Sequence, residues 1–540
     1  EDRIHFIEPD VGGSFGVRGE FYPEDFLIPS LAMRLGRPVR WIEDRQEHFV
    51  SVTHSREQQW EVALAVDRDG RFLGLDATLV NDMGAYLHVT TVPTLAAAHL
   101  PGPYRFPAYR CRVFCVMTNK APTATLRGPG LYESNFVRER AIDMAAAEFG
   151  MDPVELRRLN LIEPDQMPYS VGTDKNGTPT VYDTGDFPSV LRRSLESVGW
   201  ERLVETSRKE NAAGSGVRVG VGLACIVEPS GWGPLESAKV QVTPAGKVRV
   251  YTGATSQGQG QETTLAQVCA EILQVPLEEI TVGHGDTALM PYGQGTHASR
   301  SAVMAGSAVH HASLKLKEKI LRVAAARLEV SPVDLTLQGG RVSVVGMPDR
   351  GYSLKEVAAL VVSPSSAPDG EALEALHYHT TTHDTSAFAV HIAVVAVDVE
   401  TGFVQPRLYA LVADVGRAIN PMIVEGQLVG GAVQGLGGAL LEELVYDESG
   451  QLLTTSLMDY LLPSAAEAPA VRVTILQEAA SPSNPLGVKG VGELGTSGAG
   501  AALANAVANA LGPAVEITRL PLSPDRLHAL LATARCGAPA

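Results

Sequence analysis

The stretch Ser256-Gln257-Gly258-Gln259-Gly260-Gln261 stands between a predicted strand, 247–252, and a predicted helix that begins at about Gln261. Glycine lets the backbone approach a ligand closely, and glutamine amides both donate and accept hydrogen bonds. At the amino end of a helix such a loop suits a phosphate or a pyrophosphate, whereas a structural turn rarely needs three glutamines. The stretch therefore favours a phosphate-binding strand–loop–helix unit, although it matches neither a Walker loop nor a dinucleotide fingerprint.

Helix and strand patterns are mixed along the rest of the chain. Apolar spacing and capping residues predict helices at 24–35, 135–149, 152–161, 187–198, 261–273, 301–328, 424–440 and 498–511. Alternating apolar residues predict strands at 61–66, 74–80, 238–242, 247–252, 391–399 and 407–412, of which the first two form a hairpin. Because strands and helices do not alternate strictly, the pattern favours an α+β fold over a doubly wound sheet.

A polar stretch rich in Pro, Gly and Thr divides the chain. We expect a first lobe at 1–165, a linker at 166–185 and a second lobe at 186–540. A Ser/Pro/Ala-rich stretch at 361–374 is expected to be an exposed loop. The chain opens on the strand-like residues 4–7 without an initiator Met, so we expect the first lobe to lack its N-terminal portion.

Composition restricts the partners and the compartment. The formal net charge of −17, without a basic block, disfavours nucleic acid, and no apolar run is long enough to span a bilayer. The five cysteines form no Cys-x-x-Cys pair, which argues against a zinc ribbon or an iron–sulfur cluster in this chain. Their odd number fits free thiols in a reducing, cytoplasmic compartment. Cys111 and Cys115 could be ligands, but on an apolar strand we expect them in the core.

Two glycine-rich segments in the first lobe could bind an anion or face a cleft. Gly12-Gly13-Ser14-Phe15-Gly16 follows a strand and precedes a helix, where successive backbone amides can form an anion-binding nest. Thr125-Leu126-Arg127-Gly128-Pro129-Gly130 could present a guanidinium or an amide to a ligand. Taken alone, each segment is also compatible with a plain turn.

A fourth glycine-rich segment carries a carboxylate. Lys489-Gly490-Val491-Gly492-Glu493-Leu494-Gly495 has no other acid nearby in the sequence. A lone carboxyl group among glycines and apolar residues is expected to have a raised pKa, which suits a general base that works near neutral pH. The alternative is a solvated glutamate in a turn.

Taken together and in this order, these segments closely resemble the molybdopterin-binding large subunit of the xanthine dehydrogenase, aldehyde oxidase and aerobic carbon monoxide dehydrogenase family. The match runs from Gly12 to about Gly500. Supporting stretches are Gly295-Thr296-His297-Ala298-Ser299-Arg300-Ser301, Val415-Gly416-Arg417-Ala418-Ile419-Asn420-Pro421, Gly426-Gln427, Val433-Gln434-Gly435-Leu436-Gly437 and Asp459-Tyr460-Leu461-Leu462-Pro463. The family's hammerhead region and the start of its first cofactor domain are not matched.

The resemblance implies two cofactor-binding lobes with the cofactor between them. In such enzymes the metal is held by the dithiolene of the pterin, so no side chain of this chain is expected to ligate molybdenum. Glu493 and Arg127 match catalytic positions, Glu493 as the base that removes a proton from the hydroxyl on molybdenum. The implied cofactor contacts are Gly13, Phe15, Gly16, Gly128, Gln257, Gly258, Gln259, Gly260, Ser299, Arg300, Ser301 and Gln434.

Departures from the family pattern narrow the expected substrate. Copper-bearing carbon monoxide dehydrogenases have a Cys where this chain has Gly128, and purine oxidisers have an aromatic residue at the position of Pro129. Purine oxidisers also have a Glu where this chain has Gly19, with Glu20 one place away. The resemblance thus implies oxidative hydroxylation of an aldehyde or an N-heteroaromatic carbon, with water as the oxygen source.

The resemblance also implies partners. The cofactor of bacterial relatives is usually molybdopterin cytosine dinucleotide, and electrons leave through a [2Fe–2S] small subunit and an FAD medium subunit, so we expect a dimer of heterotrimers. One alternative is a degenerate, non-catalytic cofactor-binding or assembly subunit. Another is a cofactor-independent hydrolase that uses a Ser–His pair, but the chain has no nucleophile-elbow motif.

Overall fold

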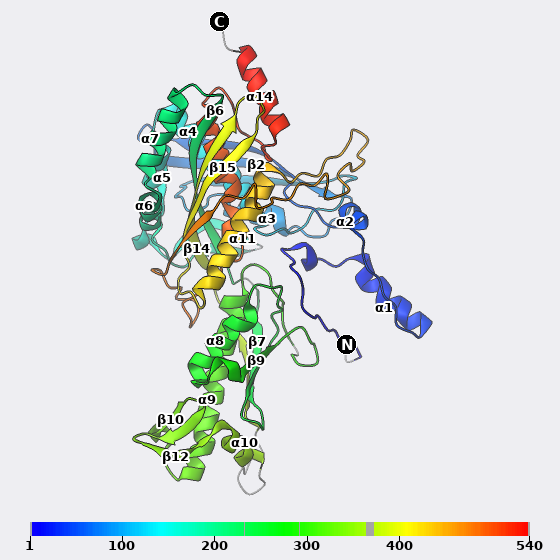
Figure 1. The fold of residues 1–540 in the computed structure, drawn as a ribbon, viewed down its shortest axis with the longest axis vertical. Helices are drawn as coiled ribbons and strands as arrows, with labels where there is room; N and C mark the ends of the chain where they lie inside the picture. The colour runs from blue at the N-terminus through cyan, green and yellow to red at the C-terminus, as the bar shows by residue number, and fades with distance from the viewer. Residues whose placement is uncertain (1–2, 176, 232, 291, 363–371, 538–540) are drawn as a thin grey trace.

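The structure is a computed structural model that describes residues 3–175, 177–231, 233–290, 292–362 and 372–537. The molecule is elongated, with a large body of mixed sheets and helices (Figure 1). Beneath this body lies a smaller lobe, formed by the strands and helices between Glu236 and His379. This arrangement confirms the predicted α+β class. No helix in the described ranges is both long enough and apolar enough to cross a membrane.

Helices of very different lengths surround the sheets. They are α1 (Pro23–Leu35), α2 (Arg45–Ser51), α3 (Thr91–His99), α4 (Leu131–Phe149), α5 (Pro153–Asn160), α6 (Phe187–Val198), α7 (Trp200–Ala212), α8 (Gln261–Leu273), α9 (Gly306–Leu328), α10 (Leu354–Val362), α11 (Pro421–Leu440), α12 (Leu494–Ser497), α13 (Ala499–Leu511) and α14 (Pro524–Gly537). A π-helical turn, Ser301–Ala305, leads into α9.

The strands form several separate sheets. They are β1 (Gln58–Val66), β2 (Phe72–Gly84), β3 (Tyr109–Met117), β4 (Tyr169–Lys175), β5 (Thr178–Tyr182), β6 (Val217–Ser230), β7 (Glu236–Val242), β8 (Val248–Thr252), β9 (Ile280–Gly283), β10 (Leu335–Gln338), β11 (Arg341–Val344), β12 (Met347–Ser353), β13 (Glu374–His379), β14 (Thr385–Asp398), β15 (Val404–Asp414) and β16 (Val471–Leu476). The sheet orders are β1-β2-β3, β16-β15-β14-β6, β13-β7-β8-β9, β10-β11-β12 and β4-β5.

The sheet β16-β15-β14-β6 is the centre of the large body. Strand β14 runs antiparallel to both β6 and β15, and β16 adds a parallel edge. Helices cover both faces, with α6 against one and α11 and α13 against the other, so β14 is buried at every residue but its last. A strand covered on both sides reads as a continuous apolar run rather than an alternating one.

Small residues let α13 lie directly on β6. Side chains added at Gly220 or Gly222 of β6 would collide with the backbone of Ala506 in α13. The predicted helix at 498–511, rich in small side chains, therefore does pack closely, against a strand as well as against neighbouring helices. The contact holds α13, which follows Glu493 and the short helix α12, against the central sheet.

A buried ionic cluster joins the first part of the chain to this sheet. On α4, Glu139 is fully buried and accepts hydrogen bonds from Arg157 of α5 at 2.8 Å and from the neighbouring Arg138 at 3.0 Å. It also accepts from the hydroxyl of Tyr104 and from the backbone N–H of Cys225 in β6. Because a buried carboxylate without such partners is very costly, this cluster holds α4, α5 and β6 together.

The smaller lobe has its own core. Helices α8 and α9 pack against the sheet β13-β7-β8-β9, and the small sheet β10-β11-β12 lies at the far end with α10 (Figure 1). The N-terminal segment reaches this lobe, where the backbone N–H of Glu8 donates to the carbonyl of Gly285 at 2.6 Å.

Most of the predicted elements are confirmed, some with extended ends. The hairpin of β1 and β2 turns at the predicted Asp67–Gly70, and Asp152 caps α5 through the backbone N–H groups of Val154 and Glu155. Helices α6 and α8 have the predicted bounds.

Three expectations about local structure are wrong or incomplete. The apolar spacing that predicts the helix at 24–35 does not correspond to a buried face, because α1 projects away from the rest of the molecule (Figure 1) and has no buried residue. Cys111 is half-buried and Cys115 is exposed, because β3 lies at a sheet edge with one face open. The range 166–185 is not irregular throughout, since it contains the hairpin of β4 and β5.

The expected loop at 361–374 lies largely outside the described residues.

Replacement of Gly222 by Ala is expected to destabilise the protein by about 1 to 3 kcal/mol, because the added methyl group would push β6 and α13 apart. Urea denaturation of both proteins measures the difference. Gly430→Ala is the matched control, since Gly430 is exposed on α11 with no atom within 4 Å of the added methyl group. That variant should be neutral or gain up to about 1 kcal/mol. Equal stabilities for the two variants would contradict this account of the α13–β6 contact.

Candidate active site

The buried guanidinium of Arg127 joins segments that lie far apart in the chain. Its Nε donates to the carbonyl oxygen of Gly492 at 2.5 Å, and its Nη2 donates to the backbone and side-chain oxygens of Gln427 at 3.0 and 3.1 Å. Its Nη1 lies 3.4 Å from Oε1 of Gln434. The backbone N–H of Arg127 donates to the carbonyl of Phe15 at 2.6 Å. The structure thus brings together the glycine-rich segments at 12–16, 125–130 and 489–495 and helix α11.

Glycines allow the backbones of these segments to pack closely against one another. Gly128 has φ +73°, and a Cβ there would lie 2.7 Å from Oγ of Ser497. Gly16 has φ +119°, and a Cβ there would lie 2.6 Å from the carbonyl oxygen of Thr125. Both conformations disfavour other residues, and a side chain at either position would separate the loops.

Glu493 lies beside a second carboxyl group. The backbone N–H of Glu493, immediately before α12, donates to Oε1 of Glu228 at 3.2 Å. Glu228 belongs to β6 and is fully buried, whereas Glu493 is half-buried. The hydroxyl of Ser299 donates to the same oxygen of Glu228. Oε2 of Glu228 has no hydrogen-bond partner among the described residues.

Burial decides the charge state of Glu228. Loss of solvation raises the pKa of its carboxyl group well above the ordinary value of 4.5, and the neighbouring Glu493 raises it further. The hydroxyl of Ser299, the N–H of Glu493 and the charge of Arg127 act in the opposite direction but do not outweigh burial. Burial therefore favours the protonated, neutral form of Glu228 over its carboxylate.

The segment that carries Ser299 is conformationally strained. Ala298 and Ser299 have φ values of +48° and +49°, a region that residues other than glycine rarely occupy. Phe15 is also in this region, at +56°. Gly490 and Gly492 allow their loop to lie close to Ser299, since a Cβ at Gly492 would lie 2.9 Å from Oγ of Ser299. Such strain is maintained only where surrounding contacts enforce it, and it is concentrated at functional sites.

The glutamine loop presents backbone to open space at the start of α8. Gly258 has φ +91° with no atom within 4 Å of an added Cβ, and α8 begins without a side-chain cap. Within the loop, the N–H of Gln257 donates to Oε1 of Gln259 at 2.6 Å. A Cβ at Gly260 would lie 2.7 Å from Cδ1 of Ile423, which belongs to α11. Helix α11 therefore contacts both this loop and Arg127.

Two residues of the 295–301 stretch have structural partners. The fully buried guanidinium of Arg300 donates to Oε2 of Glu236 at 2.5 Å and to the carbonyl of Leu235 at 3.0 Å. The hydroxyl of Ser301 lies 3.2 Å from that of Thr296. Any contact of Arg300 with a cofactor would therefore have to come from its backbone.

Comparison with known proteins identifies the family. Models described as molybdopterin cofactor-binding domains match residues 1–161 and 193–469. The 6-hydroxypseudooxynicotine dehydrogenase complex subunit gamma of Paenarthrobacter nicotinovorans is 40% identical over 98% of this chain and 66% of its own length. The chain belongs to the molybdopterin-binding large subunits of the molybdenum hydroxylases.

Further relatives extend this picture. The carbon monoxide dehydrogenase large chain of Hydrogenophaga pseudoflava is 34% identical over 91% of this chain and 63% of its own length. The crystal structure of quinoline 2-oxidoreductase from Pseudomonas putida 86 superposes with a TM-score of 0.91 at 36% identity, over 98% of this chain and 69% of that one. The chain thus spans about two thirds of the length of the curated relatives that it matches.

Glu228 is the residue of this candidate site that sequence analysis missed. The expectation that Glu493 has no acid nearby is wrong in space, because β6 brings Glu228 from 265 positions away. A signal was available, since Glu228 is the only acidic residue of strand β6, which is mostly apolar. The expected rise in the pKa of Glu493 itself stays a prediction.

Replacement of Glu228 by Gln is expected to flatten the dependence of stability on pH. Because the folded-state pKa of Glu228 is raised, its proton stabilises the fold fully below the ordinary value of 4.5, and this contribution is lost as pH rises through the folded-state pKa. Urea midpoints of the unmodified protein should therefore fall relative to those of the Gln variant from about pH 5 upward. Glu148→Gln, on the exposed surface of α4, controls for the loss of one charge. Parallel curves for all three proteins would contradict the protonated state of Glu228.

Proposed function

We propose that this chain is the cofactor-bearing part of a molybdenum hydroxylase that oxidises an aldehyde or an N-heteroaromatic carbon with water as the oxygen source. The observation that carries the proposal is the half-buried Glu493, held beside a buried neutral acid where the glycine-rich segments meet on Arg127. Membership of the family supports the same activity.

The residues present fit a molybdopterin cofactor. The open backbone at Gly258 and the uncapped start of α8 form a cradle for a pyrophosphate, which supports the cytosine dinucleotide form. Phe15, Gly16 and Gly128 would line the metal end, with Gly13 shaping the first loop. Ser299, Ser301 and Gln434 would contribute further contacts. When bound, molybdenum supplies the two-electron oxidant for the substrate carbon.

Glu228 and Glu493 have different roles in the proposed reaction. Two carboxyl groups in contact do not both ionise readily, and the more buried one retains the proton. Glu228 therefore stays neutral, and Glu493 keeps the carboxylate that accepts a proton from the water-derived oxygen nucleophile. Arg127 holds the loop of Glu493 through the carbonyl of Gly492 and lends positive charge to the pair.

An N-heteroaromatic compound is the better-supported substrate class. Quinoline 2-oxidoreductase and the nicotine 6-hydroxylase large subunit are named for nitrogen heterocycles, and both are similar to this chain over 98% of its length. Gly128 stands where copper-bearing carbon monoxide dehydrogenases have Cys, and Pro129 and Gly19 depart from the purine pattern, so carbon monoxide and xanthine are disfavoured.

The family also supports a proposal for the domains of the chain and for its partner subunits. The matches to residues 1–161 and 193–469 support a first cofactor domain at 1–165, a junction at 166–185 and a second domain at 186–540. Electrons would leave through a [2Fe–2S] subunit and an FAD subunit, because the chain has no cysteine set for a cluster. We propose a cytoplasmic dimer of heterotrimers.

Glu493→Gln is expected to retain molybdenum and pterin but to lose at least about 100-fold in turnover, because a general base typically contributes that much. Steady-state kinetics on the assembled complex, with metal content measured on the same samples, check this. Glu228→Gln should lose much less, since an amide resembles the neutral acid. Near-normal turnover of Glu493→Gln would remove Glu493 from the proton transfer.

The cofactor itself is tested by elemental analysis and nucleotide release, on the complex purified from molybdenum-supplied cells. We expect about one molybdenum per chain, as the fold provides one pyrophosphate cradle, and release of CMP on hydrolysis. Protein from the same cells that contains neither metal nor pterin would favour a degenerate assembly subunit. Molybdenum with a different nucleotide would retain the activity and overturn only the cytosine dinucleotide assignment.

A further inference from the structure

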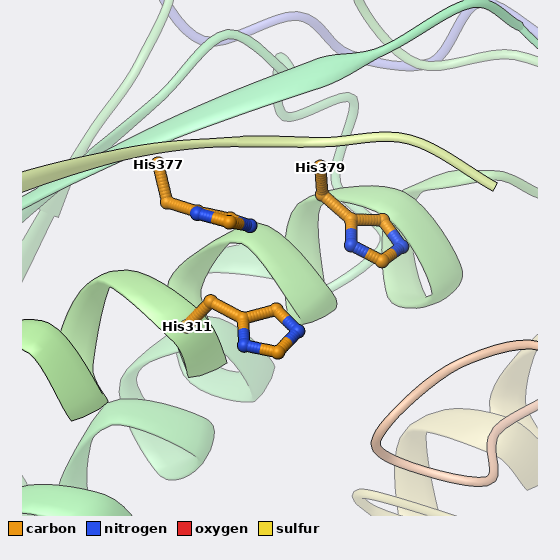
Figure 2. Close-up of side chains that lie close together, drawn as sticks. All are labelled: His311, His377 and His379. Atoms are coloured by element: carbon orange, nitrogen blue, oxygen red, sulfur yellow. The ribbon is translucent and has the colours of Figure 1, made fainter.

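Three histidines lie close together in the smaller lobe, where helix α9 packs against strand β13. His311 projects from α9 toward His377 and His379, which are alternate residues on one face of β13 (Figure 2). One potential ligand atom from each side chain lies within 4.8 Å of those of the other two. The ring centroid of His311 is 4.7 Å from that of His377 and 5.9 Å from that of His379.

One ring nitrogen of the group lacks a hydrogen-bond partner. His379 is buried, and its Nε2 has no hydrogen-bond partner among the described residues. Imidazole nitrogens are the commonest metal ligands in proteins. Coordination of an ion would give this buried nitrogen the partner that it lacks.

We propose that His311, His377 and His379 form a binding site for a borderline transition-metal dication such as Zn²⁺, separate from the molybdopterin site. Three imidazoles without a carboxylate suit such an ion better than Mg²⁺ or Ca²⁺, which prefer oxygen ligands. Because His311 and His377 are only half-buried, water can supply a fourth ligand. Coordination bonds of about 2.0 Å require the rings to converge further, which rotation about the soft χ2 torsion allows.

The neighbouring Lys315 opposes the metal. Its Nζ donates to Nδ1 of His377 at 3.0 Å, and its ammonium group adds positive charge beside the ligands. Lys315 is exposed on α9, so its side chain can turn into solvent when a metal binds. Lys315 therefore sets the affinity of the site without being a ligand, and its removal should strengthen binding.

The ion would act as a clamp within the lobe. β13 is the edge strand of the sheet β13-β7-β8-β9, and His377 is separated from His311 by a long stretch of chain. A metal bound to both elements would tie this edge to α9 in the folded state only, so it would raise the melting temperature through linkage.

The test is a Zn²⁺ titration of the purified complex, freed of loosely bound metal, in competition with a chromophoric chelator. We expect one ion per chain beyond the metals of the cofactors. His311→Ala and His377→Ala should each weaken binding by at least about 10-fold, since even outer-shell changes at metal sites commonly have that effect. His310→Ala is the matched control, as His310 is adjacent on α9 but outside the group, and it should bind like the unmodified protein.

A second variant guards against misfolding. Lys315→Ala is expected to bind Zn²⁺ more tightly than the unmodified protein, an outcome that damage to the fold cannot produce. Co²⁺ bound at the site should give the visible absorption of a low-coordinate nitrogen environment, lost in His377→Ala. Equal affinities of the unmodified protein, His311→Ala and His377→Ala, or no stoichiometric ion, would overturn the proposal. Molybdenum content, measured in parallel, should be unchanged throughout.

Discussion

The buried guanidinium of Arg127 is the constraint on which the site depends. A permanently charged group with only 7% of its surface exposed requires hydrogen-bond acceptors, because leaving it unpaired would be prohibitively costly. The acceptors that it finds come from the loop before Glu493 and from α11, while its backbone binds the loop of Phe15. Each of these segments could adopt other conformations alone, but together they must satisfy one planar donor group, and this fixes their relative positions.

Asymmetric burial then differentiates two otherwise identical functional groups. Glu228 lies within a strand that is covered on both faces, whereas Glu493 lies at a loop–helix junction with partial access to solvent. Burial therefore favours the protonated form of Glu228, whose Oε1 accepts hydrogen bonds from the N–H of Glu493 and the hydroxyl of Ser299. The strain at Ala298 and Ser299 is explained by the same contact, since that backbone conformation brings the hydroxyl of Ser299 to Glu228.

The features that the sequence predicts well are those determined locally. Helix α8 follows its glycine loop and α6 follows the cap residue Asp186, so periodicity and capping suffice for their bounds. The order of the glycine-rich segments predicts that Arg127 and Glu493 belong to one site, and the structure places their segments in contact. Glu228 and the buried pairing of Arg300 with Glu236 do not follow from local patterns, because both depend on contacts between segments far apart in the sequence. Helix α1 shows a second limit of sequence patterns, because its apolar residues are not buried. Apolar spacing indicates a helix face that could be buried but does not indicate what would cover it.

Helix α11 relates the two ends of the site to each other. Ile423, near its start, contacts the glutamine loop through Gly260, and Gln434, three turns later, contacts Arg127. Between them, Gly431 approaches the backbone of Gly495 so closely that a Cβ would lie 2.9 Å from it. Eleven residues of α-helix span roughly 16 Å, so the distance between the phosphate cradle and the acid pair is set by a rigid element rather than by loops. In the proposed function, an extended cofactor held at this cradle would lie along α11 to reach Glu493, beside the glycines that bring this helix close to the loop of Glu493.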